Sequence, residues 1–193
     1  DNFFMTIRAT KQDQMYQYQR QKLGFTYETD WGFRFDTNIR WQSERPVGNL
    51  HYNKLDGTPV GKIRTTQGSV GIDYNPGVTY VNTKQQRLPI NLDSPEFMLS
   101  HTIGFDGFMG GQYKSNITNL GIYKRQWLGS FGYVDFNVTG KIQWEKVPFN
   151  MLIQPPVNLS IFEQEATISM MKDWEFLSDR QIFWSVAWDM NGK

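Results

Sequence analysis

The chain has 193 residues and a formal net charge of +1, with 39% hydrophobic residues, 16% aromatic residues and no cysteine. A charge this close to zero, with no basic run longer than Lys124-Arg125, gives no electrostatic footprint for nucleic acid. The missing cysteines exclude disulfides, thiolate metal sites and cysteine nucleophiles, and no run approaches the roughly 20 apolar residues that a membrane helix needs.

The first strong pattern along the chain is the run WGFRFDTNIRW at 31–41, after weaker alternation at 3–10 and 16–28. Its odd positions are Trp31, Phe33, Phe35, Thr37, Ile39 and Trp41, and its even positions are Gly32, Arg34, Asp36, Asn38 and Arg40. Because successive side chains of a strand point to opposite faces, this run predicts a strand with one apolar and one polar face. Ten residues of about 3.3 Å each, tilted by about 40°, span about 25 Å, the height of the apolar band of an outer-membrane β-barrel.

Comparable segments follow to the end of the chain. Strong alternation returns at 97–105, 134–145 and 182–190, and weaker alternation occupies 62–74, 112–126 and 161–173. We count about nine strands, most longer than the five or six residues of an average soluble strand. We therefore predict an all-β fold, an antiparallel transmembrane β-barrel, with 1–193 as part of one larger barrel domain. A soluble β-sandwich with its apolar faces inward would alternate equally well.

The connections differ in length in a way that predicts a topology. Short turns are expected at 30–32, 128–130 and 175–179, and long connections rich in Pro and Gly at 43–61 and 146–160. Strand order places the short turns at one end and both long connections at the other, as in bacterial barrels with short periplasmic turns. The long connection 75–95 is the exception, and one explanation is that its flanking strands extend through 80–82 and back from Leu88.

The tryptophans suggest two belts at the strand ends. Strand order assigns Trp31, Trp127 and Trp174 to the short-turn end and Trp41, Trp144 and Trp188 to the other end, with Trp184 mid-strand. Amphipathic indoles at two membrane interfaces would give this distribution. Tryptophan also caps strand ends in soluble sheets, so the belts alone leave both alternatives open.

No group of residues predicts catalysis. His51 and His101 have no Cys, His or acidic partner at ligand spacing, so we expect structural or solvated histidines. The chain contains neither a nucleophile elbow nor a phosphate-binding loop, and the glycines at 107–111 are typical of a turn. We therefore predict no catalytic, cofactor-binding or metal-ligating residues.

Two further sets of residues have simple explanations. Asp135, Lys141, Glu163 and Glu165 are interpreted as parts of the wet inner wall of a barrel. The glycan acceptor patterns that begin at Asn116 and Asn137 lie mid-strand and are interpreted as chance matches.

A resemblance to a known family begins in the second half of the chain. The run LGSFGY at 128–133 is followed by Gly140-Lys141-Ile142 and by VPFNML at 147–152. This order resembles the outer-membrane β-barrels of Bacteroidota that carry an N-terminal carboxypeptidase-regulatory-like domain, a family of unknown function. The run WEFLSDR at 174–180 is similar to a motif of the same family. The resemblance is best over 70–193, and QWE at 143–145 departs from it where members usually keep a glycine.

The resemblance implies a location in the outer membrane of a Gram-negative bacterium. It also implies a larger polypeptide, with a signal peptide, a periplasmic β-sandwich domain and further strands outside this sequence. The chain shares a more distant likeness with outer-membrane barrels that insert or secrete other proteins. The family offers no enzymatic activity and no functional residue to carry over.

Three functions remain as hypotheses. The first is a non-enzymatic outer-membrane β-barrel, a subunit of a larger envelope complex that assembles or exports surface or outer-membrane proteins. Its expected partners are the lipid bilayer and other outer-membrane proteins, with no nucleic acid and no cofactor. The second is a porin-like channel for small solutes, to which the polar row of Arg34, Asp36, Asn38 and Arg40 is suited. The third is a soluble β-sandwich that binds glycans through exposed aromatic residues.

Overall fold

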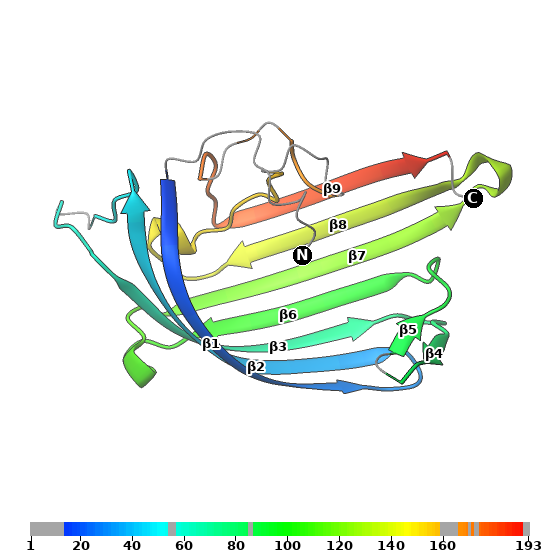
Figure 1. Ribbon diagram of the computed structural model, residues 1–193, viewed down its shortest axis with the longest axis horizontal. Coiled ribbons are helices and arrows are strands. Elements are labelled where there is room, and N and C mark those ends of the chain that lie inside the picture. Colours follow the sequence, from blue (N-terminus) through cyan, green and yellow to red (C-terminus); the bar gives the residue numbers. More distant parts are fainter. Residues whose placement is uncertain are drawn as a thin grey trace.

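The computed structural model describes residues 14–53, 57–84, 87–158, 166–169, 171 and 174–190. Seven long strands form one antiparallel sheet in the order β1-β2-β3-β6-β7-β8-β9, so the predicted all-β antiparallel fold is confirmed (Figure 1). The bounds are β1 Gln14–Glu28, β2 Phe33–Gly48, β3 Ile63–Tyr74, β6 Glu96–Gly104, β7 Ser115–Trp127, β8 Tyr133–Gln143 and β9 Arg180–Asp189. No helix of the described residues is long and apolar enough to cross a membrane.

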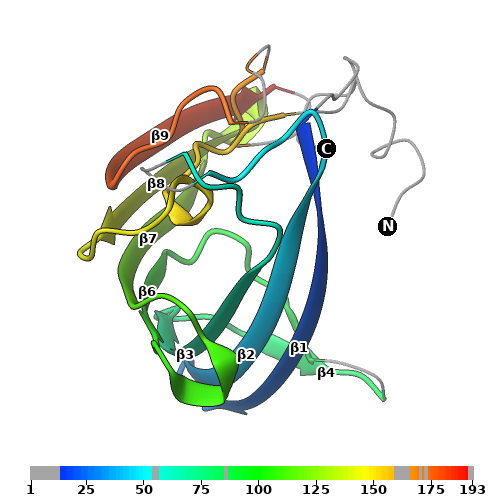
Figure 2. The same ribbon diagram turned by 90° about the vertical axis from the view of Figure 1, so that its left-hand side faces the viewer.

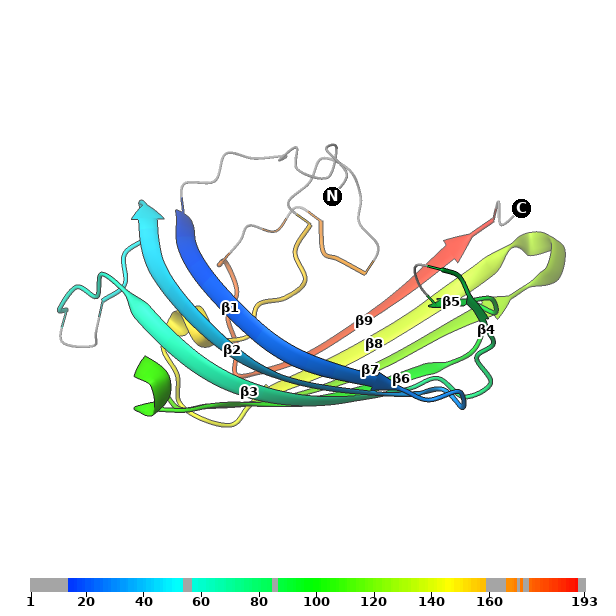
Figure 3. The same ribbon diagram turned by 60° about the horizontal axis from the view of Figure 1, so that its bottom comes forward.

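The sheet is bent into an open trough. Figures 2 and 3 show β1 and β9 on the two sides of the trough and the middle strands along its floor. Within the described residues β1 and β9 each pair with one neighbour only, so they are the two edges and the sheet is not closed. The described loop segment after β8 lies on the concave side of the sheet (Figure 3), whereas the one after β2 extends beyond the ends of the strands (Figures 1 and 3).

The strand before the first long connection is longer than the alternation predicts. We expected the strand at 31–41 to end near Gln42, but β2 continues to Gly48 and pairs with β1 as far as Gln14. Strand β3 accompanies β2 only to Glu44. Pro46 therefore has a strand neighbour on one side only, the setting in which a sheet tolerates proline.

The end of the chain follows a different path from the predicted one. We expected a strand at 161–173, part of which lies outside the described residues, as does the whole expected strand at 3–10. Residues 166–169 carry a single isolated bridge, Val157 to Ile168, and β9 pairs directly with β8. The expected strand is therefore absent from the sheet of described residues, and the turn at 175–179 lies at the long-loop end, not at the short-turn end.

Two tryptophans change ends for the same reason. Trp188 lies opposite Val134 and donates its indole N–H to the carbonyl oxygen of Phe131 at 2.9 Å, which places it at the short-turn end. Trp174 packs edge-on against Phe149 in the long connection after β8, with 5.9 Å between ring centroids. The prediction for these two residues was wrong, although each end still has three tryptophans.

The connection 75–95 contains its own hairpin. Strands β4 (Tyr80–Asn82) and β5 (Arg87–Pro89) pair with each other and not with the large sheet. Arg87 ties the hairpin to the β1–β2 turn by an ion pair of 2.9 Å with Asp30, and its guanidinium lies 4.0 Å from the ring centre of Tyr80. The explanation by extension of β3 and β6 is therefore wrong.

Glycine is required where the β1–β2 turn meets this connection. Gly32 has a φ of +90°, and a Cβ atom there would lie 2.1 Å from the carbonyl oxygen of Asn75. The N–H of Asn75 donates to the carbonyl oxygen of Gly32 at 2.8 Å. The close approach of the two backbones fixes the short-turn end of β2 against that of β3.

Candidate functional surfaces of the sheet

The strand registers join the predicted apolar rows into one continuous surface. Residues directly opposite each other on antiparallel strands share a face of the sheet. One such row crosses all seven strands, through Tyr27, Phe35, Ile72, Leu99, Leu120, Gly140 and Ile182. The rows beside it add Phe25, Phe33, Val70, Tyr74, Phe97, Ile122, Val138 and Trp184. We call these residues, together with Leu23, Ile39 and Trp41 on the same face of β1 and β2, the apolar surface.

The apolar surface is exposed. Leu23, Ile182 and Trp184 keep 70%, 81% and 69% of their surface accessible, whereas the buried hydrophobic residues of the described part are only Leu50, Tyr52, Ile63 and Ile153. A β-sandwich would cover such a face with a second sheet. Among the described residues the second sheet is only the hairpin β4–β5, with three residues in each strand, and Arg87 connects it to Asp30 in the turn between β1 and β2. In other proteins, large exposed apolar faces occur where the surface meets lipid, another protein or a ligand.

Polar atoms on the apolar surface bond to one another. The Nδ1 atom of His101 lies 3.0 Å from the hydroxyl oxygen of Thr118, and the indole N–H of Trp144 donates to the same oxygen at 2.9 Å. His101 thus has a local partner in the sheet, while His51 is exposed in the loop after β2. The described residues contain no group of three or more His, Cys, Asp or Glu side chains that could hold a metal ion.

The opposite, concave face is polar across the same seven strands. One of its rows runs through Thr26, Asp36, Gly71, Ser100, Asn119, Lys141 and Gln181. We call this face the polar surface. Loop residues lie over it, since Ala166 lines a cavity together with Glu96, Tyr123 and Asp135. The sequence alternation correctly separates the two faces, and it places Asp135 and Lys141 on the polar one.

Two clusters of charge stand on the polar surface. The Nε atom of Arg34 lies 2.9 Å from an oxygen of Asp36 and 3.9 to 4.0 Å from Glu28 and Asp73. On the other side of the trough, Arg125 and Asp135 form two hydrogen bonds of 2.7 Å each. Their side chains are only 15% and 10% exposed. The cross-strand partner of Asp135 on β7 is Arg125, a contact that the alternation does not predict.

The long-loop end of the trough carries an aromatic cluster that the sequence does not predict. Phe149 packs edge-on against both Tyr52 and Trp174, and Trp174 packs against Tyr16 of β1. We call these four residues the mouth cluster. Its members come from β1 and from both long connections, which have no periodicity that would place their side chains. Their only sequence signal is the presence of aromatic residues in loops rich in Pro and Gly.

A cavity of about 650 Å³ adjoins the mouth cluster and is lined by Val60, Tyr113 and Phe149 among others. Tyr52 is 3% exposed, and its hydroxyl has no hydrogen-bond partner among the described residues. Burial, and after it the negative charge of Glu44, raises the pKa of Tyr52 to about 12. Asn150 donates from Nδ2 to a carboxylate oxygen of Glu44 at 3.0 Å and so connects the loop to β2.

The comparisons with known proteins identify one family. The model of the family of unknown function (DUF5686), C-terminal domain, matches residues 2–142, more than half of the chain. The chain belongs to this family. No curated protein and no solved structure matches it.

Proposed function

We propose that this chain forms part of the wall of a transmembrane β-barrel in the outer membrane of a Gram-negative bacterium. The observation that carries the proposal is that one sheet has a continuous apolar face and, opposite it, a continuous polar face. The convex face is apolar from β1 to β9, and the concave face is polar along the same strands. A bilayer needs an apolar outer wall, and a barrel lumen accepts polar side chains.

The height of the apolar surface supports the proposal. On β2 it begins with Phe33 and ends with Trp41, and the next outward residues are Ser43 and Arg45. With Trp31 included, these ten residue steps give about 25 Å of height at a tilt of about 40°. Trp31 and Trp188 stand near one margin of the apolar surface, and Trp41 and Trp144 near the other, whereas Trp127 lies opposite Tyr133 on the polar face. Aromatic belts at both margins are typical of a membrane barrel.

The edges of the sheet support a role as part of a larger assembly. In lipid the unpaired N–H and C=O groups of β1 and β9 would have no partner, so further strands of the same polypeptide or of a partner must complete the wall. The mouth cluster and its cavity offer aromatic surface for a partner. We therefore propose a non-enzymatic subunit of an envelope complex that assembles or exports outer-membrane or surface proteins.

Purification tests the proposal in two stages. Extraction of the full-length protein from cell envelopes should require detergent, and high salt or carbonate alone should leave it in the pellet. Purification in mild detergent should then bring down other outer-membrane proteins in a fixed ratio. Release by salt alone would refute the membrane wall, and a monodisperse single protein would refute the complex.

A channel for small solutes is the second candidate, favoured by the polar surface and its charge clusters. The loop after β8 opposes it, because part of that loop lies over the polar surface, where Ala166 lines a cavity with Glu96 and Asp135. Planar-bilayer recordings separate the two functions. Steady unitary conductance of the purified protein would favour the channel, and a tight bilayer would favour the subunit of a complex.

A further inference from the structure

The outward face of the sheet changes character just beyond the apolar surface. On β1 to β3, the first two outward positions past Trp41 are polar or basic, and they include Arg45, Lys62 and Arg64. The apolar pair Met15 and Val47 follows only at the far end of β1 and β2. Ser43 lies opposite both Gln19 and Arg64, which fixes the shared face of these positions. For β2 the sequence predicts a long connection from residue 43, whereas it predicts strands at 16–28 and 62–74. The structure shows that β1 and β2 continue beyond the apolar margin as ordered sheet.

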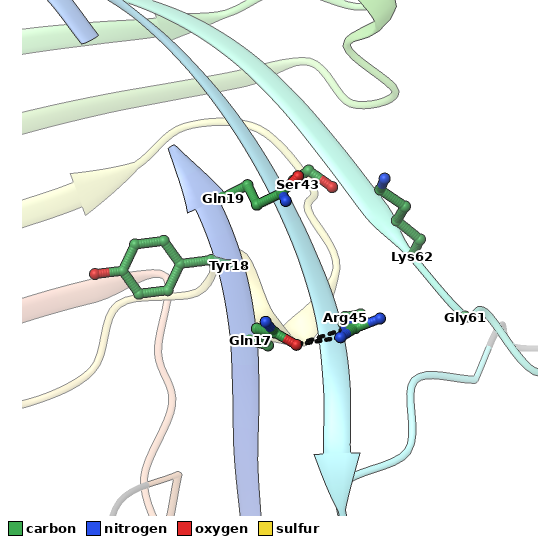
Figure 4. Close-up of a pocket in the computed structure, with 7 residues that line it drawn as sticks. All are labelled: Gln17, Tyr18, Gln19, Ser43, Arg45, Gly61 and Lys62. Carbon is green, nitrogen blue, oxygen red and sulfur yellow. Dashed lines mark hydrogen bonds between the residues drawn. The ribbon is translucent and has the colours of Figure 1, made fainter. Parts of the chain in front are cut away.

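Arg45 and Lys62 line one concavity, and Arg64 lines the neighbouring one together with Trp41, while Gln19 and Ser43 border both. A cavity of about 370 Å³ is lined by Gln17, Gln19, Ser43, Arg45 and Lys62 among others (Figure 4). Gln17 accepts a hydrogen bond of 2.8 Å from Nε of Arg45 and holds that guanidinium against the sheet. We call Arg45, Lys62 and Arg64 the basic patch.

The basic patch has no counterion among the described residues. None of their ion pairs includes any of the three side chains. The nearest acid along β2, Glu44, faces the other side of the sheet and accepts from Asn150. Three exposed cations thus share one face without an acidic residue, in a chain whose net charge is only +1. The patch is complementary to an anion that the chain itself does not supply.

The height of the patch indicates which anion it meets. From the outward position of Trp41, Arg64 is one step of two residues away, and Arg45 and Lys62 are two steps away. At about 3.3 Å per residue and a tilt of about 40°, these steps correspond to about 5 Å and about 10 Å of height. The headgroup layer on each side of the hydrocarbon core is about 5–8 Å thick, and long cationic side chains reach into it.

We propose that the basic patch binds the phosphate of an anionic lipid headgroup in the leaflet at the long-loop end. The inference rests on the proposed membrane wall. Arg64 and Arg45 supply planar donor groups that match phosphate oxygens, Lys62 adds a third charge, and Gln17 orients Arg45 before the lipid arrives. Trp41 stands below them at the margin, where its indole contacts the upper acyl chain.

Binding of a phosphate-bearing lipid to the full-length protein in detergent tests the proposal. The probe is phosphatidic acid, compared with phosphatidylcholine, and native mass spectrometry measures the bound fraction. The variant is R45Q/K62Q/R64Q, and R20Q/K22Q/K141Q removes the same charge from the polar surface. Each interfacial cation contributes about 1 kcal/mol to the attraction, so losing three weakens phosphatidic acid binding by about a hundredfold. The control triple variant should bind within twofold of the parent.

The outcomes separate this inference from the proposed wall. Insertion of the parent and both variants into liposomes is measured first, by resistance of the strands to added protease. A parent protein that does not insert refutes the wall. A parent that inserts, with equal phosphatidic acid binding in both variants, refutes the basic patch as the site. Displacement of the lipid by millimolar inorganic phosphate would show a site for free phosphate and would also overturn the proposal.

Discussion

Asp135 receives both hydrogen bonds of the Arg125 fork, from Nε to Oδ1 and from Nη2 to Oδ2, each at 2.7 Å. The pair bridges β7 and β8 on the polar surface, and the guanidinium also lies 3.8 Å from the ring centre of Tyr133. With side chains only 15% and 10% exposed, this ion pair is screened from water far more than the pair of Arg34 and Asp36. Geometry and burial together make it the strongest polar contact between neighbouring strands.

Removing the carboxylate of this pair should therefore weaken the sheet. D135N leaves a guanidinium that is largely buried and uncompensated, and we expect a loss of about 3 kcal/mol of unfolding free energy. D36N at the exposed pair should cost less than about 1 kcal/mol, because water screens that interaction. Urea unfolding in detergent micelles, followed by tryptophan fluorescence, measures both variants. Equal losses would contradict the assignment of Asp135 as a structural partner.

The outward orientation of β8 gives a second prediction. Val138 lies on the apolar surface between Ile122 and Trp184, while the adjacent Asn137 lies on the polar surface between Tyr123 and Ser185. V138R would place a cation at the middle of the membrane wall and should cost about 2–4 kcal/mol. N137R should be tolerated within about 1 kcal/mol, because its side chain points to the polar surface. Reversible refolding into lipid vesicles provides the measurement, and equal tolerance of the two variants would refute the membrane wall at this strand.

Gly132 provides a third prediction, at the turn between β7 and β8. Its φ is +84°, and an added Cβ would lie 1.9 Å from the carbonyl oxygen of Asp189 on β9. Gly129 in the same turn also has a positive φ, of +66°, but its Cβ would meet nothing within 4 Å. Both G132A and G129A place a side chain on a residue with positive φ, which costs about 1–3 kcal/mol. G132A must in addition displace the end of β9, so its thermal unfolding midpoint should fall clearly below that of G129A.

The sequence predicts the two faces of the sheet because the face to which a side chain points depends only on its position along its own strand. Strand side chains alternate with a period of two, so the row that contains Phe35 and Ile39 is separated from Arg34 and Asp36 without knowledge of any neighbour. All seven long strands of the sheet overlap a segment of predicted alternation. The pairing of Arg125 with Asp135 was out of reach, because it depends on the register between β7 and β8.

The end of the sheet at which each turn lies depends on the number of strands before it. The predicted number is wrong after β8. One extra strand, expected at 161–173, reverses the direction assigned to everything that follows. That single error moved Trp188 to the long-loop end and Trp174 to the short-turn end. The mouth cluster was missed for another reason. Tyr52 and Phe149 lie in irregular connections, where the contacts of each side chain are set by tertiary packing and leave no periodic signal.

The corrected strand order leads to a fourth prediction, on which residues share a compartment. The chain has no native cysteine, so single cysteines report without background. Ser178 pairs with Ile153 in an isolated bridge, and both long connections begin at the same end of the sheet. Exposed positions at that end are Thr58 and Lys146, and an exposed position at the other end is Ser130. We expect T58C, K146C and S178C to react together with an impermeant maleimide.

Intact cells and cells with a permeabilised outer membrane give the two states to compare. In bacterial barrels the short turns face the periplasm, so T58C and K146C should label on intact cells and S130C only after permeabilisation. S178C is partly buried and should label more slowly than K146C, but from the same side. Labelling of S178C together with S130C would place Ser178 at the short-turn end and would support the strand that the sequence predicts at 161–173. Labelling of S130C alone on intact cells would show that the barrel has the opposite orientation in the membrane. That outcome would leave the strand pairing intact, because the orientation is inferred from loop length and the shared compartment from strand pairing.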